Sequence, residues 1–89
     1  MSTDILLAAL REARRRRDTA DRDIRLLIAY GRELAAPRPY RLADLAEAAG
    51  MSISGVRTAY TPADIDHITS LLAASYVAAR EHGIPRRLT

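Results

Sequence analysis

The chain has 89 residues, 48% of them hydrophobic, and a formal net charge of +3. Its length fits a single domain, and the absence of cysteine excludes disulfides and thiolate metal sites. With His67 and His82 as its only histidines and no glycine-rich phosphate loop, the composition argues against an enzyme and against a bound metal or cofactor.

Charge and apolar residues are distributed unevenly along the chain. All 14 basic residues are arginine; residues 1–41 hold ten of them against six acids, whereas residues 42–89 hold four against five. No apolar run approaches the ~18 residues that span a membrane, and the acidic, polar start at Met1–Asp4 lacks the basic segment of a signal peptide. We therefore expect a cytoplasmic protein with no membrane partner, whose modest positive charge permits nucleic-acid binding.

Residues 1–36 are predicted to form one long helix. Apolar side chains recur there at alternating steps of three and four, the spacing of a coiled coil. This stripe contains Leu6, Leu10, Ala13, Ala20, Ile24, Leu27 and Leu34, with Arg17 and Gly31 filling its two gaps. A helix of ~33 residues would span ~50 Å and extend beyond so small a domain, so we predict a homodimer. The predicted dimer contacts are Leu6, Leu10, Ala13, Ile24 and Leu27. The orientation of the two helices is left open.

Two alternatives to this dimerising helix are also open. Asp18-Thr19 could act as an N-cap and divide the segment into two helices. Acid-to-arginine pairs four residues apart, such as Asp21 with Arg25, favour one continuous helix. The apolar stripe could instead pack on the last helix of its own chain. In either case the helix ends before Pro37, because a proline disfavours helix in the residue that precedes it.

Residues 37–41 are predicted to be a short linker to a pair of helices. The first of these runs from Leu42 to Ala49 and ends at Gly50, which tolerates left-handed backbone angles. Ser52 is the predicted N-cap of the second, over residues 53–60. The turn between the two helices is therefore short.

A C-terminal packing helix completes the predicted domain of residues 42–83. Thr61 is its predicted N-cap, with Pro62 at the first helical position and Asp64 three residues after the cap. The helix stops near Gly83, and residues 84–89 are predicted to be a flexible tail. Because no strand pattern is present, the predicted fold class is all-α.

The stretch from Leu42 to Thr61, LADLAEAAGMSISGVRTAYT, resembles the helix-turn-helix of bacterial DNA-binding regulators, both repressor-like and sigma-factor-like. Small Ala46 occupies the position where the two helices would cross, and Val56 the position that pins the second helix to the domain. The other core positions are filled by Leu42, Leu45, Ala49 and Met51. The resemblance covers 42–61 only.

This resemblance implies that the second helix enters the major groove and reads base edges with its N-terminal half. The outward residues at matching positions are Ser52, Ile53, Ser54, Arg57, Thr58 and Thr61. Arg57 is the strongest candidate for specificity, because arginine can bond bidentately to guanine, and Gly55 would let the helix approach closely. Arg38, Tyr40 and Arg41 precede the first motif helix, where phosphate contacts are expected. The predicted function is sequence-specific binding of double-stranded DNA by a small dimeric transcriptional regulator at the nucleoid.

An alternative function is a protein–protein interaction module. The predicted recognition helix carries one basic residue, and similar helical corners occur in proteins that never touch DNA. In that alternative the N-terminal helix binds a partner protein and the corner is purely structural. A steep loss of affinity with added salt would indicate DNA binding, whereas salt-tolerant assembly through the apolar stripe would indicate the interaction module.

Overall fold

The computed structural model describes residues 3–81, and every regular element in this range is a helix. The elements in chain order are α1 (Thr3–Ala29), the π-helical turn η1 (Tyr30–Leu34), α2 (Leu42–Ala49), α3 (Ile53–Arg57) and α4 (Pro62–Glu81). The predicted all-α class with a long N-terminal helix is confirmed for the described residues. The predicted helix end near Gly83 and the predicted tail over residues 84–89 lie outside them.

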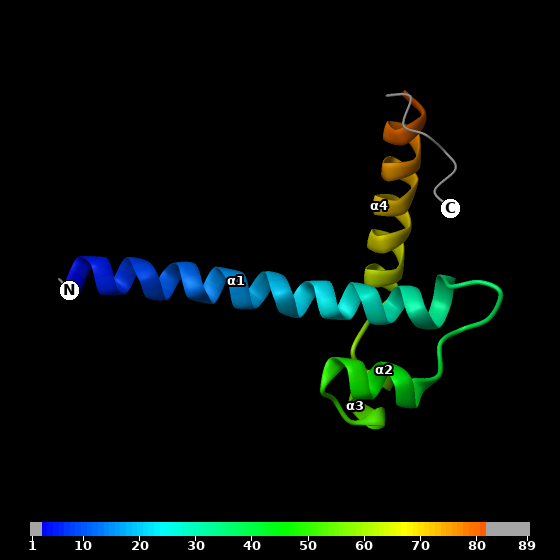
Figure 1. The fold of residues 1–89 in the computed structure, drawn as a ribbon, viewed down its shortest axis with the longest axis horizontal. Coiled ribbons are helices and arrows are strands. Elements are labelled where there is room, and N and C mark those ends of the chain that lie inside the picture. Colours follow the sequence, from blue (N-terminus) through cyan, green and yellow to red (C-terminus); the bar gives the residue numbers. More distant parts are fainter. Residues whose placement is uncertain (1–2, 82–89) are drawn as a thin grey trace.

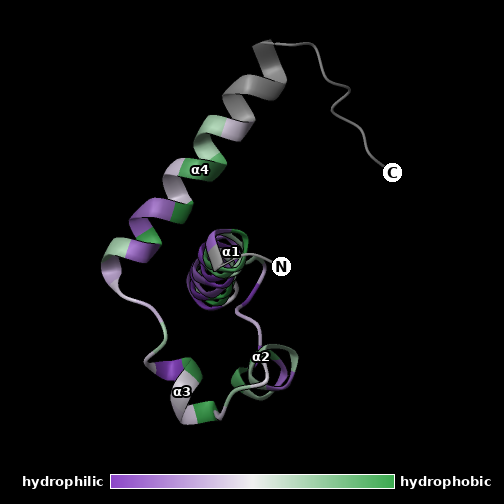
Figure 2. Ribbon diagram, turned by 90° about the vertical axis from the view of Figure 1, so that its left-hand side faces the viewer, coloured by the Kyte–Doolittle hydropathy of each residue, from purple (hydrophilic) through white to green (hydrophobic). Residues whose placement is uncertain are grey.

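Helix α1 is the axis of the molecule, and the other helices gather around its C-terminal end (Figure 1). Seen along α1, helix α4 lies on one side of it, and α2 and α3 lie on the other (Figure 2). Residues 4–20 of α1 extend away from this body, and we call them the arm. The radius of gyration is 17.2 Å, compared with about 12 Å for a compact domain of this length. The chain is therefore less compact than a globular domain of this length.

Helix α1 is continuous, so the alternative with a break at Asp18-Thr19 is wrong. Acid–arginine pairs along its surface support this, including the pair of Glu12 with Arg16, whose charged atoms are 3.7 Å apart. Arg25 does not pair with Asp21 as predicted. Its Nε atom lies 4.0 Å from the Asp64 carboxylate of α4, so this arginine links two helices.

The core lies where the C-terminal end of α1 meets the other helices. On the α2–α3 side, Ile28, Ala46 and Val56 form a buried cluster, and Val56 is fully buried. Partly buried apolar side chains surround it: Ile24, Leu42, Leu45, Ala49, Met51, Ala59 and Tyr60. Leu26 and Ala29, at the same end of α1, are also buried, and helix α4 lies on the side of α1 opposite α2 and α3 (Figure 2). The end of α1 is thus packed on two sides.

The apolar stripe of α1 divides into two parts with different surroundings. Toward its C-terminal end, Ile24 and Gly31 pack against the α2–α3 side. Toward its N-terminal end, in the arm, Leu6 and Leu10 are 48% and 56% exposed. Helix α4 lies on the other side of α1 from α2 and α3 (Figure 2). Packing of the stripe on the last helix is therefore not observed at Ile24 and Gly31, and Leu27 between them is 64% exposed.

Candidate nucleic-acid interface

Helix α2 ends at Gly50, in a backbone conformation that is strained for most residues other than glycine. Gly50 has φ of +67° and ψ of 35°, the left-handed region that costs other L-residues roughly 1–2 kcal/mol. The backbone N–H of Met51 then donates to the carbonyl of Ala46 at 2.9 Å. This confirms the predicted helix end and turns the chain sharply toward α3. We call residues 42–61 the α2–α3 corner.

Ser52 fixes the start of α3, as predicted. Its backbone is extended and its Oγ accepts a hydrogen bond from the N–H of Gly55 at 2.9 Å. A Cβ added at Gly55 would lie 3.1 Å from that Oγ and 3.4 Å from Cε of Met51. The structure thus gives Gly55 a role inside the corner, because a side chain there would crowd the cap.

Helix α3 is shorter than predicted. It ends at Arg57, and the expected extension over residues 58–60 is wrong. Thr58 closes the helix, with its Oγ1 donating to the carbonyl of Ser54 at 3.3 Å. The chain then leaves the helix because Ala59 and Tyr60 turn inward and pack on the core. Fully buried Val56 anchors the short helix that remains.

The predicted outward residues of the corner are all exposed, and two of the five polar ones have side chains with no polar partner among the described residues. The exposed set is Ser52, Ile53, Ser54, Arg57, Thr58 and Thr61. Ser54 and Arg57 have the free side chains, with neither a hydrogen bond nor an ion pair within residues 3–81. Thr61 is occupied instead: its N–H donates to the Asp64 carboxylate at 3.0 Å and its Oγ1 accepts from the Asp64 N–H at 3.3 Å. This reciprocal cap confirms the predicted start of α4.

The segment before α2 is held against the end of α1. The N–H of Tyr40 donates to the Gly31 carbonyl at 2.9 Å, and Nη1 of Arg32 donates to the Tyr40 carbonyl at 2.7 Å. Arg38 and Arg41 are exposed beside this anchor. Arg41 lies 3.7 Å from the carboxylate of Asp44, whereas Arg38 has no ion pair within the described part of the chain.

Positive charge is sparse on the α2–α3 corner and the linker that precedes it. Arg38, Arg41 and Arg57 stand against two exposed acids of α2, Asp44 and Glu47. The arginine run lies outside the corner, in the arm, where its members form exposed pairs with acids of the same helix: Arg14 and Arg17 with Asp18, and Arg15 and Arg16 with Glu12.

A bond that the sequence did not predict joins the corner to α1. The hydroxyl of Tyr60 donates to Oε2 of Glu33 at 2.5 Å. Burial raises the pKa of Tyr60 above its usual 10.0, and the hydrogen bond and negative charge of Glu33 raise it further, against a lowering by Arg32. The two residues are 27 positions apart, so no local sequence pattern predicts this hydrogen bond. The bond holds the exit from α3 against η1.

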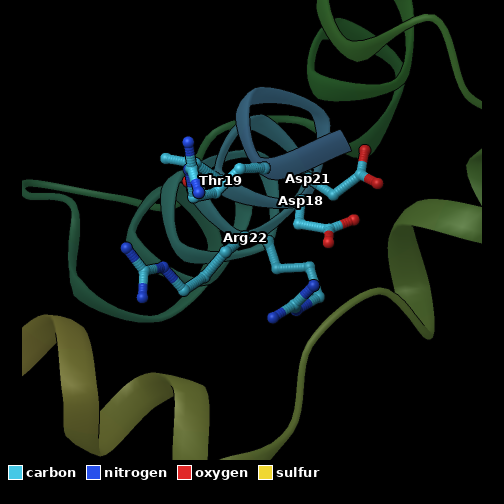
Figure 3. A pocket seen from close by; sticks show the side chains of 6 residues that line it. Asp18, Thr19, Asp21 and Arg22 are labelled. Carbon is cyan, nitrogen blue, oxygen red and sulfur yellow. The ribbon is translucent and has the colours of Figure 1, made fainter. Parts of the chain in front are cut away.

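Outside the corner, one hollow lies along α1 and is lined by Arg15, Asp18, Thr19, Asp21, Arg22 and Arg25. Figure 3 shows these side chains spreading around a single helix, with Asp18 and Asp21 on one side and Arg22 on another. Residues 3–81 contain no group of three His, Asp or Glu side chains placed to hold a metal. None of the helices in that range combines the length and apolarity that crossing a membrane requires.

No known protein family, curated protein or solved structure matches the chain.

Proposed function

We propose that the chain binds double-stranded DNA sequence-specifically, with the α2–α3 corner acting as a helix-turn-helix. The observation that carries the proposal is the presentation of α3. Buried Val56 and the Ser52 cap hold the helix from the inner side, while Ser54 and Arg57 point outward without partners within residues 3–81. Exposed polar side chains without partners, on a helix that is fixed from its inner side, are available to bind a ligand.

The dimensions and chemistry of α3 suit the major groove. An α-helix with its side chains is about 10–12 Å across, which fits the width of about 12 Å of the groove. Arg57 can bond to O6 and N7 of guanine, and Ser54 can bond to a base edge or a phosphate. Ile53, 44% exposed, can contact a thymine methyl group. Arg38 and Arg41 would meet phosphates beside the groove.

The sparse charge of this surface favours a dimer. Three arginines neutralising three phosphates per chain would give a salt slope of about −3, which is small for a DNA-binding protein. Two copies double the contacts and read a site with two-fold symmetry. The function we propose is thus that of a small dimeric transcriptional regulator at the nucleoid, which acts by occupying its site.

The test uses fluorescence-anisotropy titration against a pool of duplexes with a randomised centre, at two salt concentrations, followed by sequencing of the bound fraction. Wild type should enrich a subset of sequences and bind more weakly at higher salt. The Arg57→Ala variant should keep weak, salt-sensitive binding and lose the enrichment. Arg22→Ala is the matched control, because Arg22 is exposed and free of ion pairs within residues 3–81 but lies on α1. It should behave as wild type.

Two results would overturn the proposal: no binding above background at low salt, or unchanged enrichment by Arg57→Ala. The first of these would favour the interaction module. A specific observation supports that second candidate, namely the exposed leucines of the arm. Its signature is salt-tolerant assembly with a different protein, lost in a Leu6→Ser/Leu10→Ser variant.

A further inference from the structure

We infer that α1 pairs with α1 of a second copy in an antiparallel arrangement and in one particular register. The inference deepens the proposed function, since it supplies the geometry of the dimer assumed there. It does not depend on DNA binding, and its tests are done without DNA.

Apolar side chains are exposed at two levels of α1. Leu6, Leu7 and Leu10 of the arm are between 41% and 56% exposed, and Leu27, near the body, is 64% exposed. Large apolar side chains that gather on one exposed helix indicate an interaction surface.

The alternation of three and four along the stripe fixes which residues can face each other. In an antiparallel pair, Leu10 can lie opposite Leu27 of the second copy, with Ala13 opposite Ile24 and Arg17 opposite Ala20. Each long side chain then faces a small one near the centre. In a parallel pair, by contrast, Arg17 would face its own copy across the seam, placing two like charges in one layer.

Charges that flank the stripe select the same antiparallel register. In it Arg14 faces Asp21 of the second copy and Arg16 faces Asp23, and each pair occurs twice by symmetry. A shift by one heptad in one direction sets Arg14 against Arg14 and Arg16 against Arg16. A shift in the other direction sets Asp21 against Asp21 and Asp23 against Asp23. Every neighbouring register is thus repulsive, which is how flanking charges specify pairing.

The ion pairs of the single chain leave these groups available. Asp21 and Asp23 are exposed and have no ion pair within the described residues. Arg14 and Arg16 have side chains that are 75% and 68% exposed, and they contact acids on their own helix at 3.9 and 3.7 Å. Such exposed pairs are worth little, so the arginines can turn to a second copy.

A hollow in the body lies where the end of the second arm would arrive. In the proposed register, Leu10 of the second copy reaches the level of Leu27. An apolar hollow of about 160 Å³ opens at that level between α1 and α2, lined by Ile24, Leu27, Ile28, Leu45, Ala48 and Ala49. The two alanines leave room for a leucine side chain. The second arm would thus rest on α2 and hold each corner in a defined position.

Cysteine cross-linking tests the register, because the natural chain has no cysteine. Leu10→Cys and Leu27→Cys chains, carrying different tags, are mixed and oxidised in a glutathione buffer. The mixed disulfide should exceed either homodisulfide at least tenfold. In the antiparallel pair two copies of residue 10 lie about 25 Å apart along the helix, far beyond the 7 Å limit between Cα atoms. A predominance of homodisulfides would overturn the inference in favour of parallel helices.

A third variant tests the neighbouring register in which Arg14 would face Arg14. Ala20→Cys should not cross-link efficiently to Leu10→Cys, whereas a shift by one heptad would bring these two positions together. Circular dichroism of each variant checks that the helix content is retained. Single chains in sedimentation velocity at micromolar concentration, with no cross-link between any pair, would also overturn the inference.

A charge exchange gives a second measurement with no cysteine. Arg16→Asp or Asp23→Arg alone should weaken dimerisation at least tenfold, because each puts like charges opposite each other twice. Mixing the two variants should restore dimerisation as a heterodimer, in which every facing pair is again opposite. Arg22→Asp, on the outer face of α1, is the matched control and should leave dimerisation unchanged. Absence of rescue in the mixture would overturn the register.

Discussion

The two ends of α1 have opposite surroundings. At the C-terminal end Ile28 is 3% exposed and Ala29 is fully buried, because α2 and α3 pack on one side of α1 and α4 on the other, although Leu27 of the apolar stripe stays 64% exposed there. In the arm, Leu6 and Leu10 stay about half exposed. One continuous helix thus contributes to the core of its own chain at one end and, by our inference, to that of a second copy at the other. Periodicity alone does not distinguish these two uses.

The largest expected effect is a difference in folding stability between substitutions at the two ends of α1. Ile28→Ala should lower the free energy of unfolding by about 2–4 kcal/mol, because it opens a cavity in the core. Leu10→Ala should change it by less than about 0.5 kcal/mol in the single chain, since Leu10 is exposed there. Urea denaturation is the measurement, at a concentration where sedimentation velocity shows single chains. Equal losses in the two variants would contradict the comparison.

At higher concentration the same two variants should diverge in another way. Wild type should gain stability with concentration, since a dimer binds only folded chains. Leu10→Ala should lose most of that gain. Ile28→Ala should keep the gain, but its free energy of unfolding should be lower than that of wild type at every concentration.

An intermediate effect is expected at the turn that orients α3. Gly50→Ala should cost about 1–2 kcal/mol of unfolding free energy, because the left-handed backbone disfavours a Cβ. No atom lies within 4 Å of the added Cβ, so crowding does not contribute. Gly50→Asn is the matched control and should cost less, because asparagine tolerates these angles better. A loss from Asn as large as that from Ala would show that something other than the backbone angle matters at this turn.

Local signals in the sequence predicted local structure well. Gly50, Ser52 and the Thr61–Asp64 pair mark helix ends through bonds to residues three or four positions away, and all of them lie where expected. Ala46 and Val56 were also predicted as core, since the spacing within the α2–α3 corner requires a small and an apolar residue there.

Features set by long-range packing were missed. The end of α3 at Arg57 depends on Ala59 and Tyr60 reaching a core formed partly by Ile28, far away in the sequence. The pairing of Arg25 with Asp64 depends on where α4 crosses α1. The exposure of the candidate reading residues was expected from the resemblance to helix-turn-helix proteins, whereas the ion pairs that the arginines form are visible only in the structure.

The smallest effect concerns the bond that joins the corner to the packed end of α1. Tyr60 donates to Glu33, and burial together with this carboxylate raises the pKa of the phenol above 10.0. The folded state therefore holds that proton more tightly than the unfolded state. The resulting stabilisation is present below pH 10 and is lost as the pH rises through the raised pKa.

Thermal unfolding of wild type and Tyr60→Phe between pH 8 and 11 measures this contribution. At pH 8 the variant should have a slightly lower Tm, since one partly exposed hydrogen bond is worth about 1 kcal/mol or less. The difference should shrink as the pH rises above 10, because wild type then loses the bond as well. A difference that stays constant or grows would mean that Tyr60 stabilises the corner through its ring alone. In that case the position of α3 would depend on the apolar contacts of the ring with the core, with no contribution from the Glu33 carboxylate.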